Sequence, residues 1–161
     1  MLRDAVRGNH VEHQWVGLDD IAKSVPRAVI GAEDANFCVH NGFDFAAMEA
    51  AMARNADGKK LRGGSTISQQ TAKNVFLWQG TDWIRYARKG LEVWFTFLIE
   101  NIWGKRRIME VYLNVAETGI GTYGVEAGAQ RYFKHSAARL SRDEAARIAA
   151  ALPSPRKRAV V

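Results

Sequence analysis

Residues 83–103, "WIRYARKGLEVWFTFLIENIW", have the longest helical pattern in the chain and decide the fold class. The first half carries basic residues on one side, whereas the second half is apolar on nearly every side. A helix that is apolar all round is typical of a buried position. We therefore predict a central buried helix over about 83–102, which begins after a cap at Asp82 and ends at Gly104.

The segments on both sides of this stretch also have helical patterns, and they end at turn residues. Asp44 is placed to cap one helix, and either Ser65 or Thr66 is placed to cap the next. Ser141 and Glu144 match a capping box. Helices are thus predicted from Ser24 into the motif "EDANF" and over about 44–55, 65–76, 105–114, 125–133 and 142–152.

The remaining segments are polar or rich in glycine. Residues 1–23 are expected to be irregular, with short extended structure around 15–18, and "ETGIGTYG" at 117–124 is expected to be a loop. With about seven helices and no internal repeat, the chain is predicted to be all-α. Its 161 residues suit one domain with a hydrophobic core, residues 1–161.

The charge balance indicates an anionic partner. The formal net charge is +6 and the pI is about 9.7. Nucleic acid, an acidic membrane surface and a phosphorylated substrate all satisfy this balance, but no pattern of stacking aromatic residues supports nucleic acid. Cys38 is the single cysteine, so an intramolecular disulfide is excluded. The apolar run at 93–99 is far shorter than the roughly 20 residues of a membrane helix, so we expect a soluble chain, or a piece whose anchor lies upstream.

Glu33 and Asp34 form the first candidate site, at the end of an otherwise apolar helix. One interpretation is a pair of solvated acids at a helix end. The other is that Glu33 faces a cleft, where apolar neighbours raise its pKa and make it a general base. Phe37 follows at i+4, where it could supply the apolar wall.

A second candidate site lies on the long helix. Arg85, Arg88 or Lys89, and Glu92 share one helical face. Arg88 and Glu92, at i and i+4, could be a surface ion pair of small energy. However, Glu92 directly precedes the apolar half, so this face is expected to enter the core. A partly buried group of cations with one carboxylate suits a diphosphate.

Residues 62–74, "RGGSTISQQTAKN", form the third candidate site. The spacing is not that of a phosphate-binding P-loop. Hydroxyls and backbone N–H groups at a helix N-terminus can still bind an anion or a sugar, and Lys73 adds a cation. An ordinary turn and cap would explain the glycines and Ser65, but we expect it to leave Gln69 and Gln70 unexplained.

Two weaker patterns carry no prediction of function. His10 and His13 have a metal-like spacing but no further ligands nearby, so no metal site is assigned. "SPRK" at 154–157 matches the S-x-x-K of acyl-serine enzymes without the partner motifs of those enzymes, and we interpret it as chance.

Taken together, five segments in order resemble the peptidoglycan glycosyltransferase family (family 51). The single-domain length and the missing acyl-serine motifs resemble its monofunctional biosynthetic transglycosylases. The five segments are "AVIGAEDANFCVHNGFD", "RGGSTISQQTAKNVFL", "RKGLEVWFTFLIE", "KRRIMEVYLNVAETGIGTYGVEAGAQRYF" and "EAARIAAALPSP".

The resemblance implies a lysozyme-like α fold that polymerises lipid II into glycan strands and releases undecaprenyl diphosphate. Glu33 matches the general base, which deprotonates the 4-hydroxyl of the acceptor sugar for an inverting attack. Glu92 matches a second essential carboxylate that assists departure of the diphosphate. The residues expected to bind substrate are Asp34, Ser65, Thr66, Gln69, Gln70, Lys73, Arg85, Arg88 and Lys89.

The resemblance also implies the partners. These are lipid II, the growing glycan chain, a membrane surface and proteins of cell-wall synthesis or division, and not nucleic acid. No tightly bound cofactor is expected, although Mg²⁺ or Mn²⁺ is compatible with the site. The family's usual N-terminal membrane helix is not found in residues 1–161, so location at the outer face of a bacterial inner membrane would require an upstream anchor. Two alternatives stay open: a lysozyme-like lytic enzyme, and a non-catalytic scaffold that binds lipid II.

Overall fold

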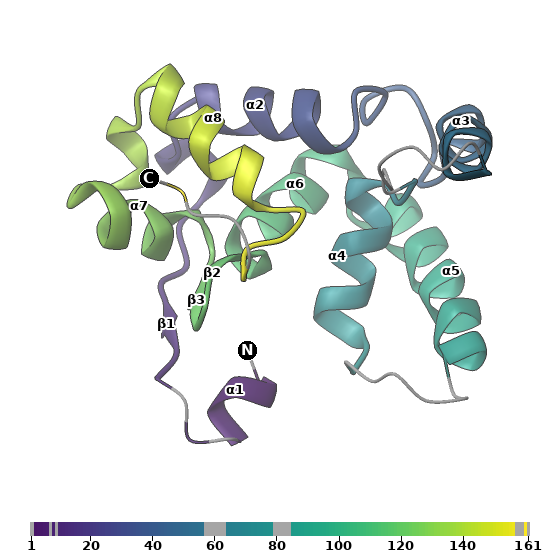
Figure 1. Cartoon of the computed structure of the whole chain (residues 1–161), viewed down its shortest axis with the longest axis horizontal. Helices are drawn as coiled ribbons and strands as arrows, with labels where there is room; N and C mark the ends of the chain where they lie inside the picture. Colours follow the sequence, from purple (N-terminus) through teal and green to yellow (C-terminus); the bar gives the residue numbers. More distant parts are fainter. Residues whose placement is uncertain are drawn as a thin grey trace.

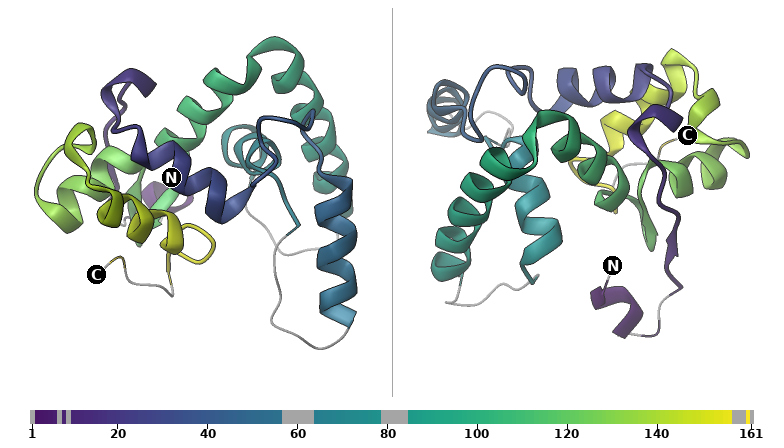
Figure 2. Two further views of the ribbon diagram at one scale, coloured as in Figure 1. Left: turned by 90° about the horizontal axis from the view of Figure 1, so that it is seen from above. Right: turned by 180° about the vertical axis from the view of Figure 1, so that it is seen from behind.

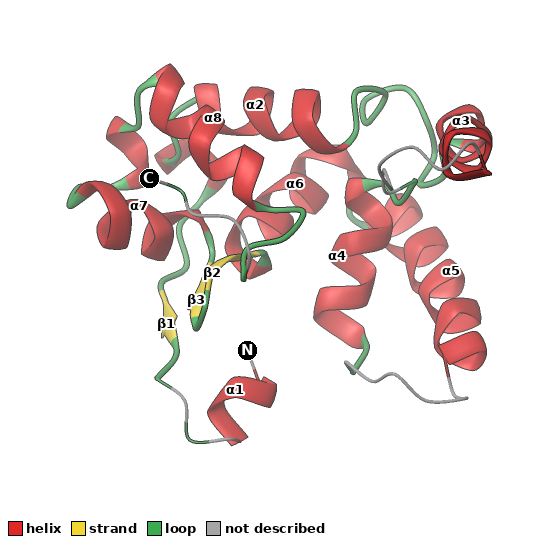
Figure 3. Cartoon of the chain, in the orientation of Figure 1, coloured by secondary structure: helices red, strands yellow, loops and turns green. Residues whose placement is uncertain are grey.

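The computed structural model describes residues 2–6, 8, 10–56, 64–78, 85–156 and 160, and these residues are mainly helical, as predicted (Figures 1 and 3). The α-helices are α1 (Leu2–Val6), α2 (Ser24–Glu33), α3 (Phe45–Ala56), α4 (Ile67–Phe76), α5 (Arg85–Ile102), α6 (Gly104–Val115), α7 (Val125–Phe133) and α8 (Arg142–Ala151). Short 3-10 helices are η1 (Leu18–Asp20) and η2 (Ala137–Arg139), and the strands are β1 (Glu12–His13), β2 (Glu117–Gly119) and β3 (Thr122–Tyr123).

The helices form two lobes that α6 connects. One lobe, here called the α3–α5 lobe, contains α4 packed along α5. The other, the α2–α8 lobe, contains α2 packed along α8, together with α7 and the small sheet (Figures 1 and 2). Helix α6 contacts α4, α5 and α7, so it belongs to both. One hydrophobic core passes through both lobes, with Val29 of α2, Ile67 of α4, Ile108 of α6 and Ile148 of α8 fully or almost fully buried.

The prediction of a central buried helix for the long apolar stretch is wrong. Trp94 and Phe97 of α5 are 57% and 54% exposed, and only one face of the helix is buried, at Glu92, Thr96 and Ile99. Burial at i, i+4 and i+7 is the pattern of an amphipathic helix. Helices α4 and α6 contact this helix, and the described residues leave its opposite apolar face uncovered. None of the described helices is both long enough and apolar enough to span a bilayer.

The predicted glycine-rich loop at 117–124 is a β-hairpin. Strand β3 pairs antiparallel with β2 and parallel with β1, and the extended structure lies at 12–13 rather than around 15–18. Gly121 at the turn has φ +74°, and a Cβ there would lie 2.5 Å from the His10 carbonyl oxygen, so a side chain would push β1 away. Helix α1 was also missed, because a five-residue helix has little pattern of its own.

The predicted helix caps are confirmed where the structure describes them. The Ala47 N–H donates to Asp44 Oδ1 at 2.8 Å, and Ser141 with Glu144 forms the capping box of α8. Gly104 follows α5 with φ +71°. Several predictions lie outside the described residues: most of the loop "ADGKK", Gly63, most of "WQGTD", the cap at Asp82, and the side chain of Arg85.

Candidate active site

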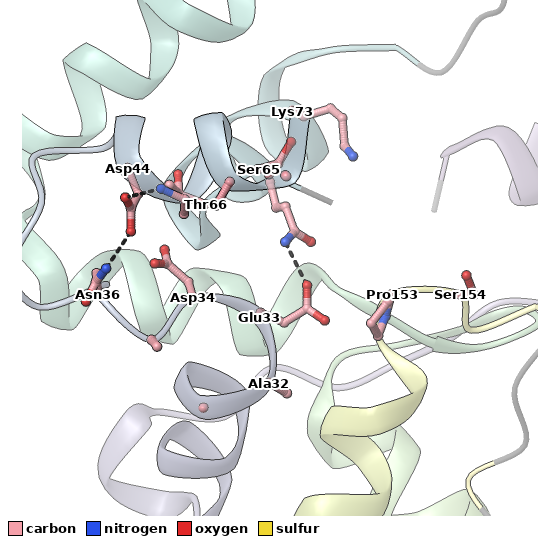
Figure 4. A pocket seen from close by; sticks show the side chains of 17 residues that line it. Ala32, Glu33, Asp34, Asn36, Asp44, Ser65, Thr66, Lys73, Pro153 and Ser154 are labelled. Carbon is pink, nitrogen blue, oxygen red and sulfur yellow. Dashed lines mark hydrogen bonds between the residues drawn. The ribbon is translucent and has the colours of Figure 1, made fainter. Parts of the chain in front are cut away.

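A pocket of about 640 Å³ lies where the end of α2, the start of α4, one side of α3 and the turn after α8 meet (Figure 4). Its walls contain six of the predicted site residues: Glu33, Asp34, Ser65, Thr66, Gln70 and Lys73. The other lining residues are Gly31, Ala32, Ala35, Asn36, Asp44, Ala47, Ala50, Ala51, Gly64, Pro153 and Ser154.

Glu33 is the last residue of α2 and points into this pocket, between α4 and the turn that contains Pro153 (Figure 4). Its Oε2 accepts a hydrogen bond of 2.9 Å from Nε2 of Gln70. Helix α2 ends here, so the helical spacing predicted for Phe37 does not apply. Phe37 is buried in the hydrophobic core and does not line the pocket, so the prediction that it forms the apolar wall is wrong.

Asp34 is buried and its carboxylate has structural partners. Oδ2 accepts the Ile67 backbone N–H at 2.9 Å, and both oxygens lie 2.9 Å from Nε2 of His40. The Gly42 backbone N–H donates to Nδ1 of His40 at 3.1 Å, so Nδ1 is an acceptor and the ring proton lies on Nε2, facing Asp34. The carboxylate therefore joins the end of α2 to the first N–H of α4.

The loop before α3 is fixed by the same network. Thr66 Oγ1 donates to the Gly42 carbonyl at 2.6 Å. Gly42 has φ +91°, and a Cβ there would lie 2.8 Å from Cγ2 of Thr96 on α5. Only glycine adopts this conformation without strain and permits this approach. Asn36, from the same loop, donates to Asp44 Oδ2 at 2.7 Å, so the pocket wall is rigid between these residues.

Gln69 has a role that the sequence interpretation missed. Thr66 is the N-cap of α4: its side chain accepts the Gln69 N–H, and Gln69 Oε1 accepts the Thr66 N–H at 3.0 Å. This is a capping box with glutamine at its third helical position. Gln69 is only 2% exposed. The expectation that a cap would leave Gln69 unexplained is therefore wrong, whereas Gln70 points to the pocket as expected.

Lys73 connects the pocket electrostatically to α5. Burial is the main cause that lowers the pKa of Lys73 from the usual lysine value, and the positive charges of Lys89 and Arg88 act in the same direction. The negative charges of Glu92 and Glu33 oppose this shift. The ammonium of Lys73 thus lies in a field set by both predicted carboxylates and by two cations.

Of the predicted residues of α5, Arg88, Lys89 and Glu92 are not among the residues that line the pocket. Lys89 Nζ lies 2.5 Å from Glu92 Oε1, with the side chain of Lys89 52% exposed and that of Glu92 8% exposed. The ion pair on this face is therefore at i and i+3. Arg88 donates to the Trp78 carbonyl at 3.3 Å. The prediction that the Glu92 face enters the core is confirmed, because Glu92 is buried.

Some residues at the pocket were not predicted. Ser154 lines the pocket although "SPRK" was interpreted as chance, and Asn36 and Asp44 line the opposite wall. Tyr112 of α6 is buried, and its hydroxyl donates to Gln70 Oε1 at 3.4 Å. The only signal for Tyr112 in the sequence is its place on the apolar face of a helix, which indicates packing alone.

The site does not gather metal ligands of its own. Across the part of the chain that the structure describes, no three His, Cys, Asp or Glu side chains come together as a metal site would need. Mg²⁺ often uses one or two carboxylates beside substrate phosphates. Glu92 has suitable chemistry, but its Oε1 is already paired with Lys89.

The geometry suits removal of a proton from a substrate that also carries an anionic leaving group. Glu33 is a carboxylate at the pocket wall that accepts a hydrogen bond from Gln70, while the adjacent Asp34 is engaged by backbone and imidazole donors. The two neighbouring acids therefore have different roles. A base with a cation in the same pocket can activate a hydroxyl group and stabilise a negatively charged leaving group.

Comparisons with known proteins agree with this arrangement. Residues 2–161 match the protein family described as Transglycosylase. A biosynthetic peptidoglycan transglycosylase of Caulobacter vibrioides is 58% identical over all 161 residues, which cover 69% of that protein.

Two further relatives have the same name. The protein of Xanthomonas campestris is 55% identical over 150 residues, 93% of this chain and 60% of its own length. That of Bdellovibrio bacteriovorus is 58% identical over 147 residues, 91% of this chain and 58% of its own length. The chain thus spans 58% to 69% of the length of these three relatives. The resemblance predicted from five sequence segments is confirmed, and this chain belongs to the transglycosylase family.

Proposed function

We propose that this chain is a peptidoglycan glycosyltransferase that polymerises lipid II into glycan strands for the cell wall. The observation that carries the proposal is the placement of Glu33. Its carboxylate lies in a pocket large enough for sugar, and the cation Lys73 lines the same pocket. The names of the relatives, biosynthetic peptidoglycan transglycosylase, support the same activity.

In the proposed reaction, Glu33 removes the proton from the 4-hydroxyl of the acceptor sugar. The oxygen forms a bond to the anomeric carbon of the growing chain, and the bond from that carbon to the diphosphate breaks. The attack comes from the face opposite the diphosphate, so the configuration inverts. One carboxylate that acts as a base on an incoming oxygen is the arrangement of inverting glycosidases, with a sugar hydroxyl in place of water.

The leaving diphosphate requires positive charge rather than a proton. Lys73 receives it from the pocket side, and Arg88 and Lys89 extend the positive field on α5. Glu92 holds Lys89 in place through their ion pair. Preorganised cations stabilise charge that develops in the transition state without reorganisation of solvent. Ser65 and Gln70 line the pocket between Glu33 and these cations and offer neutral hydrogen bonds to sugar and phosphate oxygens.

The alternatives explain less of the site. A lytic enzyme that cleaves glycan has no use for several cations beside its second carboxylate. Asp34, the acid nearest in sequence to Glu33, is engaged by Ile67 and His40 and is not available as a catalytic partner. A non-catalytic scaffold would not require a carboxylate oriented by Gln70.

The α3–α5 lobe provides a surface for a membrane, which is where a polyprenyl-linked substrate resides. Exposed apolar side chains gather on α4, on α5 and just after α4: Val75, Phe76, Trp78, Tyr86, Leu91, Val93, Trp94 and Phe97. Several exposed apolar side chains on neighbouring helices favour an interaction surface, and Trp and Tyr are favoured at the bilayer interface. We place this lobe at the outer face of the bacterial inner membrane.

Replacing Glu33 with Gln tests the proposed base. The amide cannot accept the proton, so lipid II polymerisation should fall by about 10² to 10⁴-fold, the usual contribution of a general base. Gel analysis of labelled lipid II products measures the rate. Glu12→Gln, on β1 in the other lobe, is the matched control and should keep full activity. Polymerisation by Glu33→Gln at the wild-type rate would exclude Glu33 as the base, and soluble fragments released from isolated cell walls would favour the lytic alternative.

Lys73 should make diphosphate binding dependent on pH. Because burial favours its neutral form, its charge is lost at lower pH than for an exposed lysine, and affinity should fall as pH rises through that range. Calorimetry with farnesyl diphosphate should show binding about 10-fold or more weaker for Lys73→Ala, the size of one hydrogen bond to a charged group. Lys73→Arg should retain affinity at alkaline pH. Lys23→Ala, at the opposite end of α2, is the control; wild-type affinity in Lys73→Ala would contradict the proposal.

The double substitution Trp94→Ser with Phe97→Ser tests membrane docking. Each side chain is about half exposed, so membrane insertion would bury a further apolar area worth about 1 kcal/mol each, and together a roughly 30-fold loss of binding is expected. Flotation with vesicles of phosphatidylglycerol and phosphatidylethanolamine measures it. Ile120→Ser, an equally exposed apolar residue on the hairpin turn, should bind normally. Equal flotation of the double variant and wild type would place the membrane contact elsewhere.

A further inference from the structure

A hydrogen-bonded chain of three side chains connects the core to Glu33. The hydroxyl of Tyr112, on α6, donates to Gln70 Oε1 at 3.4 Å. Gln70, on α4, donates through Nε2 to Glu33 Oε2 at 2.9 Å. Helices α4 and α6 pack against each other, so both links come from elements that the core holds in place. Figure 4 shows the second link as the dashed line that reaches Glu33.

The chain has a direction because its members differ in what they can donate. A carboxylate only accepts hydrogen bonds, so Gln70 must turn its NH₂ group toward Glu33. Its amide oxygen then faces Tyr112, whose hydroxyl donates a proton to it. If the amide were reversed, its oxygen would face the carboxylate without a proton between them. Tyr112 therefore favours the one amide orientation that supports Glu33.

Tyr112 is suited to remain a donor over the whole working pH range. It is 1% exposed, and burial is the main cause that raises the pKa of its hydroxyl, followed by the negative charges of Glu33 and Asp34. The hydroxyl therefore keeps its proton to higher pH than that of an exposed tyrosine. The hydroxyl of an exposed tyrosine, by contrast, would exchange hydrogen bonds with water and would not hold one orientation.

We propose that Gln70 is a positioning residue for Glu33 and that Tyr112 acts through Gln70, so that the two together fix the direction of the carboxylate and favour its ionised form. The inference rests on the proposed function, in which Glu33 is the base. A hydrogen bond to the charged form of an acid favours that form. A base that is ionised and aimed before substrate arrives loses no time or energy in reorienting.

Other charged groups around Glu33 also affect how readily its carboxyl group ionises. Asp34 is adjacent in sequence but its carboxylate is engaged by Ile67 and His40. Lys73 of α4 lies near enough for its charge to interact with Glu33. Asp44 lines the pocket from the loop before α3, and the turn after α8 contributes Pro153 and Ser154, which carry no charge. The test must therefore change the hydrogen-bonded chain while these charges stay constant.

Three variants separate the links. Tyr112→Phe removes one hydroxyl, and Gln70→Met removes the amide but keeps an unbranched side chain of similar length. Tyr132→Phe is the matched control, because its hydroxyl also donates at 3.4 Å, to the Thr118 carbonyl, on the other lobe. Melting temperatures of all variants show whether any change is only structural.

The first readout does not need turnover. The side-chain carboxyl resonance of Glu33, assigned by its loss in Glu33→Gln, is titrated by ¹³C NMR in the substrate-free protein. In Gln70→Met the titration midpoint should move up by about one pH unit, the size of a hydrogen bond to a charged group. Tyr112→Phe should move it up by roughly half as much, and Tyr132→Phe should not move it. Unmoved midpoints in both pocket variants would overturn the inference.

The second readout tests whether Tyr112 acts through Gln70. In the double variant the midpoint should move no further than in Gln70→Met alone, because the first link has nothing left to orient. Additive shifts would overturn that part of the inference. The acidic limb of kcat/KM for lipid II should follow the same order. If wild type fails to polymerise lipid II, the proposed function fails, whereas the NMR titration still decides whether the hydrogen-bonded chain supports Glu33.

Discussion

The carboxylate of Asp34 holds the two lobes in register at the pocket. It accepts the first N–H of α4 from Ile67 and the ring N–H of His40, and it lies directly after the last residue of α2. A buried carboxylate is costly unless donors surround it. Here two segments provide donors: the loop after α2, where the Gly42 N–H fixes the ring of His40, and the start of α4, through the Ile67 N–H. Breaking this contact would leave a buried charge with too few donors.

The rest of the site follows from that junction. With Ile67 fixed, Gln70 lies about one turn further along α4, where its amide donates a hydrogen bond to Glu33. Lys73 lies a further turn along, where the charges of Arg88, Lys89 and Glu92 on α5 act on its ammonium group. The capping box of Thr66 and Gln69 prevents the first turn from fraying. The hydrogen bonds of Asp34, Thr66 and Gln69 thus fix where Glu33, Gln70 and Lys73 lie. In the proposed reaction, the neutral groups bind the substrate, the cations stabilise the leaving diphosphate, and Glu33 accepts the proton.

Much of this could be predicted from the sequence where the causes are local. The caps at Asp44 and Ser141 depend on side chains within three residues, and the helix at 125–133 was predicted with its observed bounds. Glu33, Gln70 and Lys73 were assigned from motif resemblance, and the structure brings them to one pocket.

What could not be predicted depends on contacts between distant segments. The apolar pattern of α5 does not indicate whether Trp94 packs against a neighbouring helix or is exposed, so the exposure of Trp94 could not be predicted. Strand β3 of the hairpin also pairs with residues 12–13, across more than a hundred residues of chain. The sequence indicates only that Tyr112 packs in the core, because its hydrogen bond to Gln70 depends on how α4 and α6 pack together. The capping role of Gln69 could not be predicted, because a capping box also depends on the conformation of the turn before the helix.

The central claim is that Glu33 acts alone as a base while cations receive the diphosphate, and the stereochemistry of the product tests it most directly. A single displacement with one base must invert the anomeric centre, whereas a covalent or lytic double displacement would retain it. NMR of the first new glycosidic linkage, made from lipid II of known configuration, measures this. Every new linkage is expected to have the configuration opposite to that of the diphosphate-linked donor. Retention of the donor's configuration would contradict it.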